Sequence, residues 1–487
     1  MCAPVLLPAF LAAVLLAGCT VGPNYRRPAA VMPPEYKEPA PWRAASPHDQ
    51  LPRGQWWAIF ADPQLNDLEA GALAANQSIE AARNQLEQAR ASAQVATSGL
   101  FPQTGVAASA QRQRLSGTRA FVTPPVTAVT ASTLQLPFTI NYEADLFGGI
   151  RRGIESANAQ YQSSAAGLEN VRLVIEAEVA ADYFSVRELD AEIAVVDDAV
   201  AYEQRGLDLV ERRHNGGIAS GLDVAQQQTV LDSTRTQAAL LRQQRAQFEH
   251  AIAVLVGTAA SSFTLPVRPL QAEPPAIPLG VPSDLLERRP DIAGAERQVA
   301  AQNAQIGVAA SARYPSLNLL GGAGWLTRDI SQVFNAPSLF WSLGAGLAQP
   351  LVNGGRTTAQ VAGARAAYSA AVAQYRETVL TAISQVEDGL SGLSVLAGAA
   401  GTQQQAVADA QRALTIANDR YVGGLVTYID VINAQETLLS NQRLATQLLG
   451  QRLITSVALI KALGGGWDAA SLQSVGVQPA LRQALSQ

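Results

Sequence analysis

Two stretches of the chain alternate between apolar and polar residues, as a β-strand with one apolar face does. Between residues 133 and 143, Leu, Leu, Phe, Ile and Tyr occupy every second position, with mostly Thr, Gln, Asn and Glu between them. In 339–347, Leu, Trp, Leu, Ala and Leu alternate with mostly small or polar residues. Weaker, Gly- and Ala-rich patterns near 103–115 and 315–327 supply a partner strand for each. The sequence therefore predicts four strands per chain.

Long helical patterns follow each strand pair, over about 151–211 and 356–417. At ~1.5 Å per residue, ~60 residues reach ~90 Å. The glycine pairs Gly216-Gly217 and Gly423-Gly424 interrupt these helices, and a return helix follows each pair.

A shorter helix precedes each strand pair. In the second half, apolar residues recur every three or four positions from Ile292 to Ala310. Proline disfavours helical geometry in the residue before it, so these helices end before Phe101-Pro102 and Tyr314-Pro315.

The two halves of the chain resemble each other at a spacing of about 207 residues. Three segments match in the same order: Ala82–Pro102 with Ala295–Pro315, Gly149–Arg151 with Gly354–Arg356, and Arg213–Gly217 plus Asp223 with Arg420–Gly424 plus Asp430. We therefore predict an internal duplication. The first repeat is expected over 63–270, the second over 271–467, and a C-terminal tail over 468–487.

The strand count constrains the assembly. An alternation of about ten residues is the length of a membrane β-strand. Four strands cannot close a barrel, and lipid does not tolerate open sheet edges. Two copies would give eight strands and three would give twelve. The alternative is a soluble two-sheet module with both faces covered.

The N-terminus carries a short apolar run, from Val5 to Gly18, that ends in Leu16-Ala17-Gly18-Cys19. Small residues before a cysteine are typical of a bacterial lipoprotein signal, which is cut before the Cys. We expect 1–18 to be a signal peptide and 19–62 a lipidated, Pro-rich segment, with S-diacylglycerol and an N-acyl chain on Cys19. The alternative is an ordinary signal peptide, and no Lys or Arg precedes the run.

Composition excludes several classes of protein. Hydrophobic residues make up 48% of the chain, charged residues only 15%, and the net charge is −5. That balance has no basic excess for nucleic acid. The three histidines lie apart, no phosphate-binding loop is present, and we expect no metal, no cofactor and no enzyme activity.

The two predicted helical turns hold the residues most worth testing. Asp223 and Asp430 occupy equivalent positions, one turn into each return helix. An acidic residue there can simply stabilise the helix N-terminus, by ~0.3–1 kcal/mol. If several chains converge at these turns, each Asp becomes part of a ring of like charges at a narrow opening, with Arg213 and Arg420 as counter-charges.

Short motifs spread over the mature chain together resemble one family, the TolC-like outer-membrane factors, in the lipoprotein branch called NodT-type. The motifs are the lipid signal at Cys19 with Thr20–Tyr25, Trp56-Trp57, Phe60 to Leu65, Glu143–Gly148, Leu285–Glu296, Arg420-Tyr421 with Gly424, Ala434-Gln435, and Ala462–Trp467.

This resemblance implies a homotrimer in the bacterial outer membrane, with a twelve-stranded barrel in the lipid continued by a twelve-helix barrel across the periplasm. It implies docking to a periplasmic adaptor and to an inner-membrane pump of the proton-driven RND type. Asp223, Asp430 and Tyr421 match residues at a periplasmic aperture that opens like an iris. Relatives can carry an acidic and a charged residue where this chain has Asn433 and Val426.

The sequence thus favours a passive exit duct for efflux, of mixed α and β fold. A structural periplasmic helical lipoprotein and an exit channel for type I secretion are the alternatives.

Overall fold

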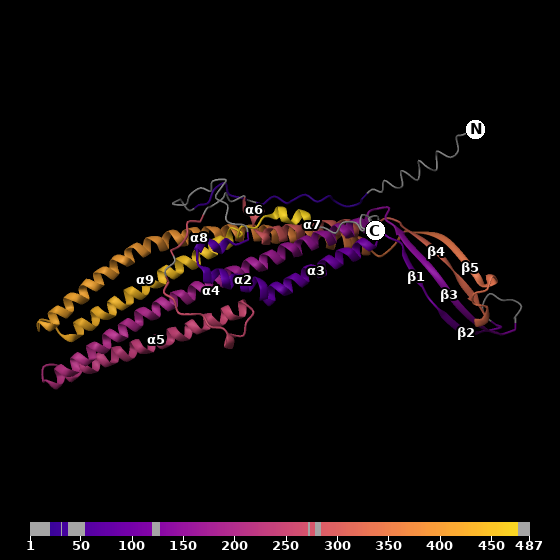
Figure 1. The fold of residues 1–487 in the computed structure, drawn as a ribbon. Helices are drawn as coiled ribbons and strands as arrows, with labels where there is room; N and C mark the ends of the chain where they lie inside the picture. The colour runs from indigo at the N-terminus through magenta and orange to yellow at the C-terminus, as the bar shows by residue number, and fades with distance from the viewer. Residues whose placement is uncertain are drawn as a thin grey trace.

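The computed structural model describes residues 20–30, 32–37, 54–118, 127–270, 273–277 and 284–475. Four helices dominate the molecule: α4 (Gly149–Asn215) and α8 (Arg356–Val422), of 67 residues each, and α5 (Gly221–Leu255) and α9 (Tyr428–Ala462), of 35 residues each. The α4–α5 and α8–α9 hairpins extend to one end of an elongated rod, and a β-sheet lies at the other end (Figure 1). The expected long helices and their Gly-Gly breaks are confirmed, with helix ends a few residues further out.

Shorter helices complete the rod. They are α2 (Pro63–Ala75), α3 (Gln77–Ser98), α6 (Leu285–Arg288) and α7 (Pro290–Ser311). Short 3-10 turns lie at η1 (Trp56–Phe60), η2 (Ala260–Ser262), η4 (Ile330–Gln332), η5 (Ala336–Ser338) and η6 (Ala469–Ser474). Helices α3 and α7 both end before the Phe-Pro or Tyr-Pro pair, as expected.

The sheet is antiparallel and meets the helices at one end of the rod (Figure 1). Its strands are β1 (Gln103–Val106), β2 (Ser109–Leu115), β3 (Val129–Ala144), β4 (Ser316–Thr327) and β5 (Leu339–Ala348). The order is β1-β3-β4-β5, and β2 also pairs with β3. The outer strands, β1 with β2 on one side and β5 on the other, each have one neighbour among the described strands.

The first predicted strand, 103–115, is interrupted at its centre. Both of its pieces keep one register on β3, in which Gln103 faces Asn141 and Ser109 faces Gln135. At the break, the Ala107 amide donates to the Pro137 carbonyl at 3.2 Å. Proline has no N–H to return a second bond, so β3 loses one ladder contact there. The interruption follows from one residue of the partner strand.

The core lies around α4, which packs against α2, α3, α5, α7 and α9. Trp56, Tyr183 and Phe184 are buried there, and the Trp56 indole donates to Glu176 at 2.9 Å. Burial raises the pKa of Glu176 to about 7. Among the described residues, none of the helices is both long and apolar enough to cross a membrane.

Residues 20–30 run as an extended strap along the helices. The Val21 amide donates to the Phe147 carbonyl at 3.1 Å, where the sheet meets α4. Buried Arg152 donates to the Val21 carbonyl at 3.2 Å and to Asn24 at 2.8 Å. The strap is therefore part of the folded body. The predicted signal peptide, 1–18, and the predicted lipidation site, Cys19, lie outside the described residues.

Candidate functional site: the helical tips and the sheet face

The two helical tips share one backbone geometry. Gly217 and Gly424 both have a φ of +73°, in the left-handed region that favours glycine. The amide of the residue after each glycine donates to a carbonyl in the last turn of the preceding helix. Ile218 donates to Arg213 at 2.8 Å, and Leu425 donates to Arg420 at 2.9 Å. The second glycine of each pair thus reverses the chain.

The two predicted aspartates begin the return helices. The Asp223 carboxylate accepts from the Ser220 amide at 2.9 Å, and the Asp430 carboxylate accepts from the Thr427 amide at 3.0 Å. Each pair forms a capping box, in which two orphan donors of the helix start are satisfied. Asp223 is half-buried and Asp430 is exposed in the single chain. Both therefore stabilise their turns, whatever further role they have.

The two arginines near the tips behave differently from each other. The Arg213 guanidinium lies over the Tyr421 ring, 4.7 Å from its centroid. This cation–π contact joins the first hairpin to the second. Within the part of the chain that the structure describes, neither Arg213 nor Arg420 forms an ion pair with Asp223 or Asp430. The expected counter-charge arrangement is not present within one chain.

Tyr428 is the tip residue that sequence reasoning missed. It is only 3% exposed and packs against Tyr421, with the ring centroids 5.0 Å apart and the rings tilted by 58°. A Cβ added at Gly206 of α4 would lie 2.8 Å from the Tyr428 hydroxyl, so glycine there leaves room for the tyrosine. Burial raises the pKa of Tyr428. The signal was available, because Tyr428 replaces Gly221 of the first repeat.

Further contacts join the two hairpins behind the tips. Asn418 of α8 donates to the Tyr202 hydroxyl of α4 at 2.7 Å. Arg443 of α9 is ion-paired with Glu192 of α4 at 2.7 Å. These bonds hold the hairpins of one chain side by side.

A buried carboxyl lies between these contacts. Glu203 of α4 accepts from the Thr234 hydroxyl at 3.1 Å, while its other oxygen has no partner among the described residues. Burial raises the pKa of Glu203, and Glu436 adds to the shift. Its charge is therefore poorly accommodated.

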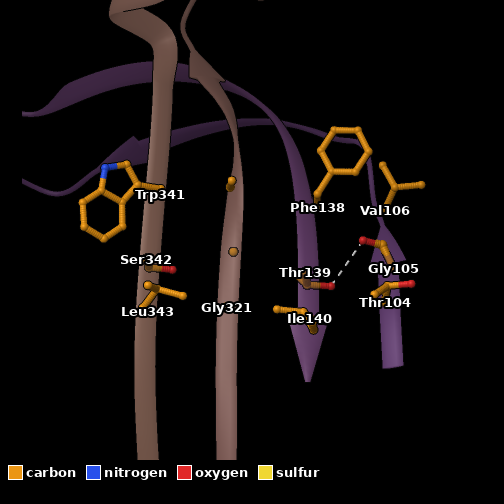
Figure 2. Close-up of a pocket in the computed structure, with 12 residues that line it drawn as sticks. Thr104, Gly105, Val106, Phe138, Thr139, Ile140, Gly321, Trp341, Ser342 and Leu343 are labelled. Atoms are coloured by element: carbon orange, nitrogen blue, oxygen red, sulfur yellow. Dashed lines mark hydrogen bonds between the residues drawn. The ribbon is translucent and has the colours of Figure 1, made fainter. Parts of the chain in front are cut away.

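At the opposite end of the rod, the strand register gathers the apolar residues on one face. Phe138 faces Ala323, which faces Trp341; likewise Ile140 faces Gly321, which faces Leu343. Figure 2 shows these residues around a shallow hollow across β1, β3, β4 and β5. Trp341 is 72% and Leu343 is 81% exposed, so none of the residues that the structure describes covers this face.

Glycine shapes the same face. A Cβ at Gly321 would lie 2.6 Å from Ile140 and 3.3 Å from Leu343, so the neighbouring side chains lie over this position of β4. The predicted alternation of polar and apolar positions is confirmed. An exposed apolar face of this kind is typical of a surface that contacts lipid or another protein.

The described residues contain no cluster of three or more His, Cys, Asp or Glu side chains that could hold a metal ion. The His214 ring is bonded to the Ala219 carbonyl of its own turn at 3.0 Å.

The family model described as "Outer membrane efflux protein" matches residues 70–258 and 281–465. The pyoverdine export outer membrane protein OpmQ of Pseudomonas aeruginosa is 35% identical over 439 residues, covering 88% of this chain and 91% of its own length. The toluene efflux pump outer membrane protein TtgF of Pseudomonas putida is 30% identical, covering 96% and 98%.

Solved structures agree. The outer-membrane channel OprN superposes with a TM-score of 0.85 at 28% identity, covering 92% of this chain and all of its own. The outer membrane protein VceC of Vibrio cholerae superposes with a TM-score of 0.78 at 30% identity, covering 86% and 100%. The chain therefore belongs to the outer membrane efflux protein family and is an outer-membrane channel protein of an efflux system.

Proposed function

We propose that three copies of this chain form one passive exit duct, coupled to a periplasmic adaptor and to an inner-membrane pump of the RND type. Energy enters at the pump, and the duct carries out no reaction. The observation that carries this proposal is the uncovered apolar face of a sheet that has an open edge on either side.

Open sheet edges make an assembly necessary. Unpaired backbone groups cost several kcal/mol each in lipid, so a sheet that spans a membrane must close. In the proposed trimer, β5 of one copy pairs with β1 and β2 of the next. Four strand positions from each of three copies then give a barrel of about twelve strands.

The helices support the same assembly. Helices α4 and α8 each run the length of the helical rod, and shorter helices pack along them: α3 and α5 along α4, and α7 and α9 along α8. Each chain thus supplies four helical positions, and three copies supply twelve.

We place the gate at the tips. Three copies would bring the exposed Asp430 carboxylates, and the half-buried Asp223 carboxylates, around one periplasmic opening. Arg213 and Tyr421 hold the two hairpins together in the closed state, while Arg420, which has no ion-pair partner among the described residues, faces the neighbouring copy. Outward movement of the hairpins would open the duct.

A lipid anchor on Cys19 fits a sheet that lies in the membrane and helices that lie outside it. The following residue, Thr20, lies against Gly148: a Cβ on that glycine would be 2.9 Å from the Thr20 backbone. Gly148 is where the sheet meets α4. An acyl chain on Cys19 would therefore attach at the level where the barrel leaves the membrane.

The duct does not select the cargo in this proposal. The two relatives above are named for pyoverdine export and toluene efflux, which are chemically unlike. We propose that the pump selects the cargo and that the duct accepts what the pump delivers. A structural spacer, the alternative role, would not require the apolar sheet face.

The test is the mass of the purified mature protein in detergent, measured by native mass spectrometry. The proposal expects a trimer whose N-terminal cysteine carries diacylglycerol and an acyl chain. A monomer would contradict the duct, and a trimer with an unmodified N-terminus would contradict the lipid anchor alone.

A further inference from the structure

The apolar face of the sheet has a defined outer limit. On β3 the apolar run extends from Leu134 to Tyr142, and Ala144 closes it near the helices. At ~3.3 Å per residue and a tilt of ~45°, the run from Leu134 to Ala144 covers a height of ~25 Å. That height matches the apolar band of an outer-membrane barrel. The next positions outward on the same face, Ser132 and Thr130, are polar.

Two arginines stand just beyond this limit on the neighbouring strand. Arg112 of β2 faces Ser132, and Arg114 faces Thr130. Opposite residues in an antiparallel pair share one face, so both arginines lie on the face that carries Leu134 and Phe138. Both are exposed. Among the described residues, neither guanidinium has a hydrogen-bond, ionic or aromatic partner.

Strand β2, which carries both arginines, lies at the end of the sheet away from the helices (Figure 1). With the helices in the periplasm, that end faces the outside of the cell, where outer-leaflet headgroups lie. The placement rests on the proposed trimeric duct. Pairing of β2 with a neighbouring copy would use its backbone edge, and would leave the side chains of this face free.

We propose that Arg112 and Arg114, with the hydroxyls of Ser132 and Thr130, bind the phosphate groups of a phosphorylated glycolipid of the outer leaflet. A guanidinium donates two parallel hydrogen bonds to phosphate, and a hydroxyl can donate a third. The aliphatic stems of both arginines lie along the apolar face, against the acyl chains, while their charges reach the headgroups. A chain of net charge −5 has no general attraction for phosphate, so the site is local.

Two positive charges spaced by two residues also suit a ligand with more than one phosphate. The cross-strand pairs Arg112–Ser132 and Arg114–Thr130 form two adjacent donor sets along the strand. The surface therefore distinguishes phosphorylated from neutral glycolipid at the rim of the barrel.

The test adds lipid A with both phosphates, or enzymatically dephosphorylated lipid A, to the purified lipidated protein and counts bound lipid per trimer by native mass spectrometry. The wild type should bind the phosphorylated form at least about tenfold more tightly. The double variant R112Q/R114Q should lose about tenfold in affinity for the phosphorylated form. The charge-matched control R83Q/R90Q removes two exposed arginines of α3 and should bind as the wild type does.

Equal binding of the two lipids by the wild type, or unchanged binding by R112Q/R114Q, would overturn the site. Should the double variant fail to assemble, the single variants R112Q and R114Q must each weaken binding, and unchanged binding in both would equally overturn it. The trimer mass is read in the same spectra. A wild type without a trimer contradicts the duct itself, whereas a trimer that ignores phosphate contradicts only this site.

Discussion

The two helical tips of one chain have the same backbone conformation and differ in the side chains that pack behind it. Both reverse at a glycine with a φ of +73°, and both return helices begin with a capping box. The first tip, however, contributes a glycine at 206 and a buried acid at 203. The second contributes Tyr421 and Tyr428, which fill the space that the first leaves. The two turns therefore have the same backbone conformation, and their side chains are complementary.

The largest expected effect comes from Tyr428→Ala. Removing a buried aromatic side chain costs ~3–5 kcal/mol, and here it also removes one of the contacts between the two hairpins, at Gly206. The variant should melt earlier and conduct more in planar bilayers. Tyr375→Ala is the matched control, because Tyr375 is 1% exposed but lies in the main core. It should melt earlier without conducting more; equal conductance in the two variants would remove Tyr428 from the gate.

The common conformation of the two turns can be tested by replacing each glycine of a pair with alanine in turn. Gly424→Ala should cost ~1–2 kcal/mol because an L side chain is strained at positive φ. Gly423→Ala, with a φ of −74°, should cost little. Hydrogen exchange of the turn amides measures the difference. Gly217→Ala and Gly216→Ala should repeat it, and a different result at the first tip would break the equivalence of the two turns.

The buried acid of the first hairpin predicts a pH dependence. The pKa of Glu203 is raised in the folded state, chiefly by burial, so that state holds its proton more tightly. The stability from this group is complete below its ordinary pKa of 4.5 and is lost as pH rises through the raised value. Thermal melting should therefore show less stability at pH 8 than at pH 5. Glu203→Gln should make that slope shallower without abolishing it, because Glu176, with a pKa raised to about 7, contributes with the same sign. An unchanged slope would assign all of it to other groups.

A smaller effect is expected from the arginines. Arg213→Ala removes a cation–π contact worth ~0.5–1 kcal/mol at an exposed site. It should loosen the tips and slightly raise conductance. Arg420→Ala is its counterpart in the second repeat and lacks an aromatic partner among the described residues, so tip packing should not change. Equal effects would show that charge, and not the Tyr421 ring, matters.

The smallest change in stability belongs to Asp430→Ala, at ~0.3–1 kcal/mol for a charge at a helix start. A ring of these carboxylates in a trimer would also attract cations, so the variant should alter the voltage and cation sensitivity of the channel. If stability alone changes, Asp430 is only a capping residue.

Much of the fold could be predicted because it is local. Period-two alternation predicted the strands, and glycine pairs and X-Pro pairs predicted where helices end. The interrupted first strand was missed, since its cause is Pro137 on the partner strand. The pairing of Tyr428 with Gly206, and of Arg213 with Tyr421, depends on how two distant hairpins pack. Periodicity within one segment carries no information about such contacts.

The single-channel conductance of the purified, lipidated protein in a planar bilayer tests the central claim most directly. We predict channels of low conductance at rest, because the paired hairpins close the tips of an otherwise open duct, and a clear increase in Tyr428→Ala. A protein that never conducts, in either form, would contradict the account.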